Sequence, residues 1–225
     1  MTTAHAEGTP IISGELQGTG HTLRAKDNQI YLGTYYARGV TPDLELRTSV
    51  LGWLFGANLS TEYAFIQSKK QALSGALGLG YDWDGGYNIS LTPTYTLGGQ
   101  KTNRLNVSLG YGLYSDVFTD TEGVKSRSGS STIPLTVSYD IASGLERSVF
   151  RFGATSNILS VVDGSPVFNV YGKWHYGWET YRLSLGLLLT NSGISGLEQV
   201  LEVADVDWSP PPLIPIPTVS MWWRF

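Results

Sequence analysis

Few residues of this chain can carry catalytic or metal-binding chemistry. The 225-residue sequence has no cysteine and three scattered histidines, His5, His21 and His175. This excludes thiol nucleophiles and disfavours a zinc centre. His175 lies in the stretch WHYGW, with no serine or carboxylate two residues away, and we expect Ser184 further up the neighbouring strand. Since a hydrolase needs a nucleophile beside its base, an enzyme is the least favoured function. We expect no metal and no cofactor.

Basic residues in the last quarter of the chain indicate ion binding instead. The group consists of Lys173, His175, Arg182 and Arg224. If the chain reverses at about Gly177, Lys173 falls opposite Arg182, and the other two members lie close by. Like charges directly opposite one another are unfavourable unless an anion lies between them. Two interpretations stay open: an anion-attracting constriction, or charges neutralised by a carboxylate such as Glu45 or Glu15.

A second charged pair is expected nearer the start of the chain. In a hairpin that turns at about Trp53–Leu54, Arg47 and Glu62 fall nearly opposite each other. Such a cross-strand pair contributes roughly 0.2–1 kcal/mol to stability. We interpret it as structural bracing within a lumen.

The elements that position these residues show an apolar/polar alternation of period two, which predicts β-strands. Clear examples are 89–97, 105–113, 133–141 and 181–189. Each run has the ~9–11 residues of a tilted strand that crosses a bilayer. The longest apolar runs are 50–55 and 185–189, and both fall well short of the ~20 residues of a membrane helix.

The composition of the second face decides between a soluble sandwich and a membrane barrel. It consists mainly of Gly, Ser, Thr and Asn, and charged residues make up 15% of the chain, against roughly 25% in typical soluble domains. Small polar residues suit a narrow wet lumen, so the aliphatic and aromatic face would meet lipid. Aromatic residues near strand ends form the expected membrane girdle: Tyr81, Trp83, Tyr87, Trp174, Tyr176, Trp178, Tyr181, Trp223 and Phe225.

The expected fold is an all-β, transmembrane, antiparallel up-and-down β-barrel. Eleven strands can be counted from Asn28–Ala37 to Ile216–Phe225, and Thr9–Leu16 is the candidate for the twelfth. Bacterial single-chain barrels have even strand numbers, so we expect twelve strands, with ten as the alternative. Residues 1–8 are expected to form a flexible segment, and residues 9–225 a single barrel domain.

The sequence TVSMWWRF at positions 218–225 resembles the C-terminal signature of bacterial outer-membrane β-barrel proteins. Phe225 stands last, and Trp223, Met221 and Val219 step back from it by twos. The resemblance implies a place in the bacterial outer membrane and recognition of this strand by the barrel-assembly machinery. Two prolines, at positions 215 and 217, depart from a perfect strand and are tolerated only near its start or at an unpaired position.

The expected function is a narrow passive channel for small solutes or ions, as a monomer in a lipid bilayer. The alternative is a closed structural or recognition barrel that binds a partner through its extracellular loops. The loop at 191–215 is acidic through Glu198, Glu202, Asp205 and Asp207. A net charge of −4 without a basic run argues against nucleic acid as a partner.

Overall fold

The computed structural model describes residues 19–23, 25–32, 35–68, 70–98, 103–119, 125–142, 148–160, 168–177, 180–191 and 213–225. The strands in chain order are β1 Asn28–Tyr31, β2 Tyr36–Thr41, β3 Leu44–Thr48, β4 Gly56–Gln67, β5 Gln71–Asp82, β6 Tyr87–Leu97, β7 Arg104–Leu109, β8 Tyr111–Thr119, β9 Lys125–Ala142, β10 Ser148–Ser160, β11 Phe168–Gly177, β12 Tyr181–Thr190 and β13 Ile214–Arg224.

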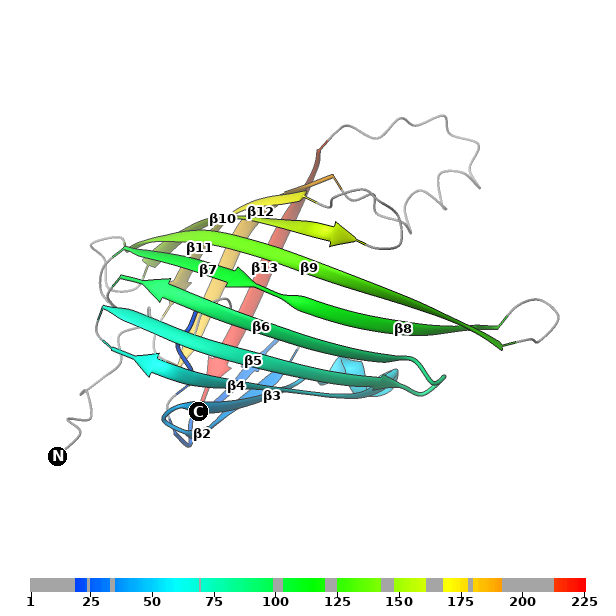
Figure 1. Ribbon diagram of the computed structural model, residues 1–225. Coiled ribbons are helices and arrows are strands. Elements are labelled where there is room, and N and C mark those ends of the chain that lie inside the picture. The colour runs from blue at the N-terminus through cyan, green and yellow to red at the C-terminus, as the bar shows by residue number, and fades with distance from the viewer. Residues whose placement is uncertain are drawn as a thin grey trace.

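These strands form a closed antiparallel barrel of twelve strands with up-and-down connectivity (Figure 1). β7 and β8 occupy one place in the wall, because both pair with β6 and with β9. The ladder is interrupted at Gly110, opposite Pro134, which has no N–H to donate. The prediction of an all-β antiparallel barrel of about twelve strands is therefore confirmed.

The barrel closes through β1 and β13. Gln29 lies opposite Arg224 and Tyr31 opposite Trp222. Asn28 and Phe225 exchange two backbone hydrogen bonds, with N···O distances of 2.9 and 3.0 Å. We call the end of the barrel at Phe225 the near end and the opposite end the far end.

The twelfth strand has an origin different from the predicted one. The expected first strand, Asn28–Ala37, is two antiparallel strands, β1 and β2, with Ile30 opposite Tyr36. The backbone reverses between them, and the N–H of Tyr31 donates to the carbonyl of Tyr35 at 2.9 Å. The segment Thr9–Leu16, the earlier candidate, lies outside the described residues, as do residues 1–8.

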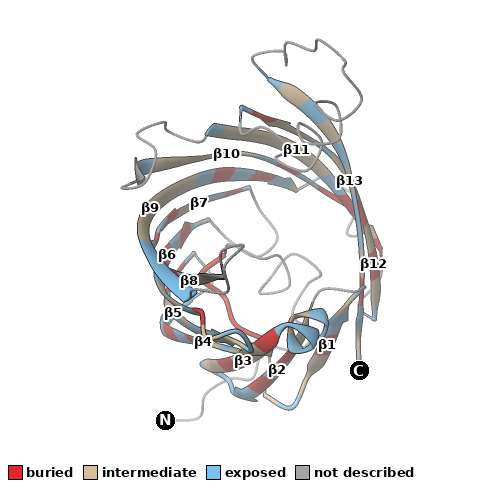
Figure 2. Cartoon of the chain, turned by 90° about the vertical axis from the view of Figure 1, so that its right-hand side faces the viewer, coloured by how far each residue is buried: buried red, intermediate tan, exposed pale blue. Residues whose placement is uncertain are grey.

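Alternation separates a polar inside from an apolar outside (Figure 2). On β6, the inward Thr96 is fully buried whereas the outward Leu91 is 53% exposed. On β5, the inward Ser74 is 1% exposed and the outward Leu79 is 49% exposed. A soluble sandwich places its bulky apolar residues inside, so this polarity is inverted.

The described residues contain one helical element, the 3-10 turn η1 at Leu51–Leu54. No helix in this part of the chain is long and apolar enough to cross a membrane.

Candidate functional site

A row of inward-facing residues crosses six neighbouring strands in the lumen, and we call it the charged row. Strand register places each member directly opposite the next. Its members are Arg104 on β7, Asp140 on β9, Arg151 on β10, Lys173 on β11, Gly186 on β12 and Thr218 on β13. The row lies in the near half of the barrel, because Arg104 begins β7 and Asp140 stands two residues before the end of β9.

Asp140 is the acceptor at the centre of this row. Arg151 donates from Nε and Nη2, with Nη2 at 2.9 Å from Oδ2, and Arg104 Nη2 lies at 2.9 Å from the same oxygen. Asn106 Nδ2 donates to Oδ2 at 3.2 Å and to Ser138 Oγ at 3.3 Å. All five side chains are buried. Charge-assisted hydrogen bonds of this kind compensate the removal of the ions from water.

Lys173 continues the row beyond Arg151. Its aliphatic stem passes over Gly186, where an added Cβ would lie 2.7 Å from Lys173 Cγ and 2.9 Å from Thr218 Oγ1. The ammonium lies 5.3 Å from the centre of the Tyr171 ring. Among the described residues, no carboxylate forms an ion pair with Lys173. The glycine therefore leaves room for the base of the lysine stem, while the ammonium lies over the Tyr171 ring on its own strand.

The predicted opposition of Lys173 and Arg182 is wrong. Arg182 lies opposite Gly177 on one side and Trp222 on the other, four residues along β11 from Lys173. Its guanidinium is buried 5.2 Å from the Trp222 ring centre. The hairpin turns after Gly177, beyond the predicted point, so Arg182 lies closer to the near end than Lys173 does.

His175 has a partner that the sequence interpretation placed elsewhere. It stands directly opposite Ser184, and Ser184 Oγ lies 2.9 Å from His175 Nδ1. The expected offset of Ser184 is therefore wrong. Both side chains are buried in the lumen wall.

Arg224 faces inward, yet its ion pair is separate from the charged row. Its guanidinium pairs with Asp27, and Nε lies 2.8 Å from Oδ2. Asp27 directly precedes β1, so this ion pair braces the closure between β1 and β13. The four members of the basic group from the sequence thus occupy four different levels of the lumen.

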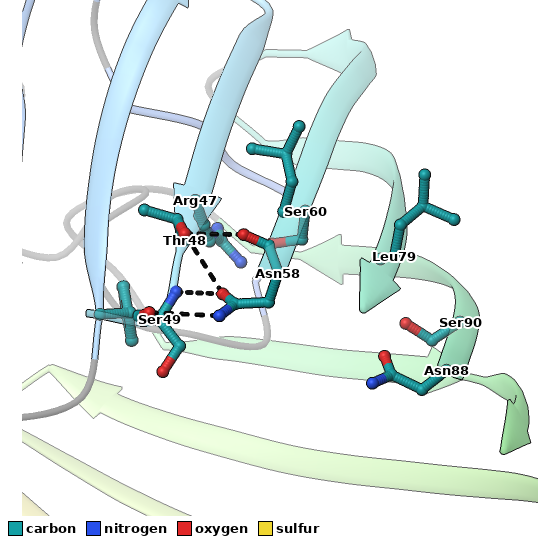
Figure 3. Close-up of a pocket in the computed structure, with 11 residues that line it drawn as sticks. Arg47, Thr48, Ser49, Asn58, Ser60, Leu79, Asn88 and Ser90 are labelled. Carbon is teal, nitrogen blue, oxygen red and sulfur yellow. Dashed lines mark hydrogen bonds between the residues drawn. The ribbon is translucent and has the colours of Figure 1, made fainter. Parts of the chain in front are cut away.

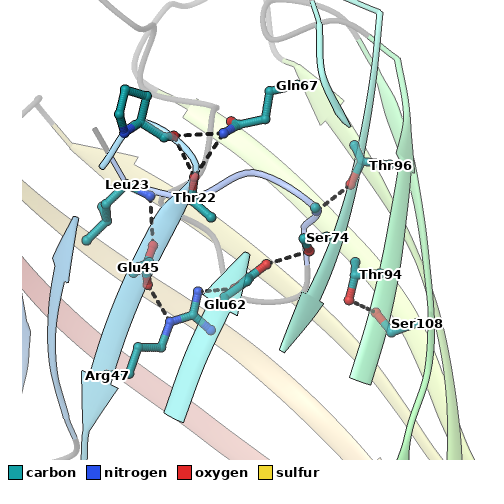
Figure 4. Close-up of polar contacts among 12 residues, drawn as sticks. Thr22, Leu23, Glu45, Arg47, Glu62, Gln67, Ser74, Thr94, Thr96 and Ser108 are labelled. Carbon is teal, nitrogen blue, oxygen red and sulfur yellow. Dashed lines mark hydrogen bonds and ion pairs between the residues drawn. The ribbon is translucent and has the colours of Figure 1, made fainter. Parts of the chain in front are cut away.

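An acidic cluster lies on the opposite wall, on β3, β4 and β5 (Figure 4). Arg47 forms ion pairs with both Glu45 and Glu62. Ser74 Oγ donates to Glu62 Oε1 at 2.6 Å. The expected register is wrong by two residues, because Glu62 lies opposite Glu45 and Arg47 lies opposite Ser60. Arg47 reaches Glu62 diagonally and neutralises two facing carboxylates.

Residues 19–23 lie inside the barrel against this wall, and we call them the inner segment. Gly20 N–H donates to Thr96 Oγ1 at 2.8 Å, and Leu23 N–H donates to Glu45 Oε2 at 2.7 Å. Thr22 Oγ1 donates to the carbonyl of Pro42 at 3.0 Å. An added Cβ at Gly20 would lie 3.0 Å from two carbonyl oxygens of β5 and β6. The inner segment and the buried side chains around it fill part of the near end, which we call the floor.

The far half of the lumen is more open. Its lining residues are small and partly exposed, and a cavity of about 310 Å³ opens along the inner face of β3 to β6 (Figure 3). Asn58 organises the rim, since its carbonyl accepts from Thr48 Oγ1 at 2.7 Å and its Nδ2 donates to the carbonyl of Ser49 at 3.2 Å. Polar residues of this lining include Ser60, Asn88 and Ser90. We call this half the vestibule.

The electrostatics of the floor are asymmetric. Among the described residues, Arg104 and Arg151 share the carboxylate of Asp140 on one wall and Lys173 lies opposite Arg151, whereas the opposite wall carries two carboxylates and one arginine. Within the described residues, Nε and Nη1 of the fully buried Arg104 have no hydrogen-bond partner. Such a wall can bind water or a small anion.

The predicted girdle residues lie at the two ends of the barrel. Tyr81, Trp83 and Tyr87 are exposed at the far ends of β5 and β6. At the near end, ring contacts link Tyr181 with Trp223 at 5.8 Å and Trp174 with Tyr176 at 5.5 Å. Phe225 is also exposed there. Trp178 lies outside the described residues, as do Glu198, Glu202, Asp205 and Asp207.

Lys173 is the one member of the charged row that was predicted as a site residue, and the sequence interpretation did not assign a site role to the others: Arg104, Asp140, Arg151, Gly186 and Thr218. The signal for Arg104 was present, because it directly precedes Leu105, the outward first residue of an alternating run. Gly186 had no comparable signal, since its role depends on which side chain crosses it.

Comparison with known proteins does not assign the chain to a family. A scan against protein-family models and a search of curated proteins both find no match for the chain. The functional conclusion therefore depends on geometry.

Proposed function

We propose that this protein is an integral β-barrel of the bacterial outer membrane. The inverted polarity of the wall supports this, because leucine, isoleucine and aromatic side chains cover its outside and polar side chains fill its inside. The aromatic residues at both ends match the two interfacial girdles of such barrels. Membrane insertion would be as a monomer, with β13 read by the barrel-assembly machinery.

We further propose a narrow passive channel that prefers small anions and performs no covalent step. One observation carries this proposal: among the described residues, Arg104 and Arg151 share the single carboxylate of Asp140, and the neighbouring Lys173 faces the lumen without an ion pair. A surplus of positive charge in a low-dielectric constriction lowers the barrier for anions and raises it for cations.

The inner segment limits passage in this proposal. It occupies the near end of the lumen with backbone hydrogen bonds to Thr96 and Glu45. We expect small currents from the full chain and larger steady steps when the segment is absent.

The test is single-channel current in a planar bilayer, for the full chain and for a chain lacking residues 2–22. Steady ohmic steps with an anion-selective reversal potential support the proposal. Folded barrels that pass no current in either form would exclude a channel. Cation selectivity in the shortened chain would show that the floor does not make the channel selective for anions.

One observation favours a second function, recognition of a partner at the far end. β8 and β9 extend as a long hairpin beyond their neighbours (Figure 1), paired as far as Thr119 and Lys125. Arg127 braces its base by donating to the carbonyl of Gly85 at 3.2 Å and by lying 5.7 Å from the Tyr87 ring centre. Binding lost on shortening this hairpin, with conductance unchanged, would support recognition.

A further inference from the structure

A cavity of about 400 Å³ opens at the far end, where the long β8–β9 hairpin begins to extend beyond its neighbours (Figure 1). Three strands contribute to its lining: Tyr87 on β6, Leu113 and Ser115 on β8, and Arg127, Gly129 and Ser131 on β9. Strand register places Ser115 at the centre, with Tyr87 opposite it on one side and Gly129 opposite it on the other. We call this cavity the outer pocket.

The outer pocket lies on the outside of the barrel wall. Residues directly opposite one another in an antiparallel sheet share a face. Ser115 lies opposite Tyr87, and Leu113 lies opposite Ile89. Both β6 residues belong to the exposed apolar outside. Because Tyr87 is a girdle residue of the far end, the pocket lies at the depth where such aromatic rings meet lipid head groups.

Arg127 supplies a positive charge to the outer pocket. Its Nη2 donates to the carbonyl of Gly85 at 3.2 Å, and its guanidinium carbon lies 5.7 Å from the centre of the Tyr87 ring. Among the described residues, no carboxylate forms an ion pair with Arg127. Asp116 on β8 faces the other side of the sheet, and Asp84 accepts from a backbone N–H of its own turn at 3.4 Å. The guanidinium is therefore held in place while its charge stays uncompensated.

Ser115 supplies a buried hydroxyl. The residue is 4% exposed, and no group in the described part of the chain forms a hydrogen bond with its Oγ. A buried hydroxyl without a partner is costly, and native structures usually pair it with protein, water or a ligand. The facing residue, Gly129, leaves the adjoining space open, since an added Cβ there would have its nearest neighbour at 3.7 Å. A cation and a hydroxyl donor thus line the same cavity.

An apolar surface continues from the outer pocket toward the middle of the barrel. Leu113 lines the pocket itself, and Ile89, Leu91 and Tyr111 follow on the same face of β6 and β8. These four side chains are between 38% and 53% exposed, and we call them the apolar strip. A donor group at girdle depth beside an aliphatic strip matches the two parts of a lipid, its head group and its acyl chains. A soluble anion would contact only the first part.

We propose that the outer pocket binds the phosphate group of an anionic membrane lipid, whose acyl chains lie along the apolar strip. Arg127 pairs with the phosphate through a charge-assisted hydrogen bond, and the Ser115 hydroxyl donates to one of its oxygens. This inference rests on the proposed membrane location of the barrel. It gives the β8–β9 hairpin a binding site on the outside of the wall, separate from the lumen.

The cysteine-free chain permits a direct test with single fluorescent labels. Ile89→Cys carries a label beside the outer pocket, and Ile158→Cys carries one at an exposed position in the far half of β10. Both are refolded into vesicles of digalactosyldiacylglycerol, a neutral lipid without phosphate. The vesicles also contain a small fraction of nitroxide-labelled phosphatidylglycerol or of nitroxide-labelled galactolipid. The ratio of the galactolipid to the phosphatidylglycerol concentration that gives equal quenching measures the preference for phosphate.

We expect both nitroxide lipids to quench both labels. The preference should be about fivefold at position 89, the effect of about one basic side chain, and close to one at position 158. Absence of quenching at both positions would overturn the membrane location itself. Quenching at both positions with a preference of one at position 89 would overturn the outer pocket alone.

Substitutions in the Ile89→Cys background separate the outer pocket from a general attraction to the basic hairpin. Arg127→Gln should reduce the preference to about one, whereas Lys125→Gln, which removes the same charge two residues away on β9, should leave it unchanged. Equal reductions by both substitutions would overturn the pocket. Ser115→Ala should lower the preference about threefold by removing one hydrogen bond.

Gly129→Val keeps both basic residues and fills the outer pocket, so it tests the site even if Arg127→Gln does not fold. It should also reduce the preference at position 89, and an unchanged preference would overturn the pocket.

Inorganic phosphate distinguishes a lipid from a soluble ligand. An excess of it at constant ionic strength should leave the preference at position 89 unchanged, because free phosphate has no acyl chains to contact the apolar strip. Loss of the preference would show that the pocket binds soluble phosphate, and would overturn the lipid as its occupant.

Discussion

Asp140 lies directly opposite Arg151 across β9 and β10, and both oxygens of its carboxylate accept hydrogen bonds from that guanidinium. Arg104, on the other neighbouring strand, shares the same carboxylate. One acid therefore holds two buried arginines in the lumen wall.

Asp140→Asn should destabilise the barrel strongly. The substitution leaves two buried guanidinium groups without their counter-ion, and breaking such a pair costs about 3–5 kcal/mol. Urea unfolding of the refolded barrel, followed by tryptophan fluorescence, measures the change. Asp116→Asn, at an exposed position on β8, is the matched control and should change stability little. Equal losses from both substitutions would contradict the central role of Asp140.

Replacing Lys173 and Arg182 together by glutamine should shift the ion selectivity of the channel toward cations. Two cations of the floor are then removed, while Asp140 remains. Reversal potentials under a salt gradient, in the chain lacking residues 2–22, measure the shift. Lys125→Gln serves as the control at the far end. An unchanged reversal potential in the double variant would remove the floor from the selectivity mechanism.

Gly186→Val should displace the lysine stem and destabilise the wall. An added Cβ at this position lies 2.5 Å from the carbonyl oxygen of Gly172, 2.7 Å from Lys173 Cγ and 2.9 Å from Thr218 Oγ1, and overpacking of this kind typically costs about 1–3 kcal/mol. Thermal unfolding measures the loss. Gly129→Val is the matched control, because an added Cβ there has its nearest neighbour at 3.7 Å. The hypothesis fails if Gly129→Val is the more damaging substitution.

Acidification should release the inner segment. Burial, and secondarily the nearby Arg104, lowers the pKa of His21 to about 4 from 6.5. Between these two values the released segment binds a proton that the docked segment does not, so docking weakens as pH falls from about 6.5 to about 4. The full effect is on the order of 3 kcal/mol. Conductance at pH 7.5 and pH 4.5 measures it, with larger currents expected at the lower pH. A His21→Gln chain should lose most of this pH dependence, and an identical response in that chain would contradict the assignment.

The apolar/polar alternation in the sequence predicted which face of the sheet each residue occupies. The same period of two explains why the predicted cross-strand partners were wrong. The predicted partner of Arg47 was two residues away from its true partner, Ser60, and that of Arg182 was four residues away from Gly177. Slips by an even number keep every side chain on the same face of the sheet. The inward direction of Lys173, Arg182 and Arg47 was therefore obtained, while their depths were wrong.

Depth depends on where each turn begins, and turn positions are weakly specified by alternation alone. The division of Asn28–Ala37 into β1 and β2 illustrates this limit. A ten-residue segment has the same amino-acid composition whether it forms one strand or two strands joined by a turn, so composition does not reveal the turn. Only the pairing of β1 with β13 shows that two strands are needed to close the wall.

The short pairing of β1 with β13 sets the order in which the molecule assembles. Its three residue pairs join residues 191 to 195 positions apart in the chain, whereas the other wall pairings mostly join strands adjacent in sequence. Bringing such distant segments together has the largest loop-closure entropy of any contact in the wall, so this seam should form last and open first. Amide hydrogens of Asn28 and Phe225 should accordingly exchange with deuterium faster than those in the centre of the β4–β5 hairpin.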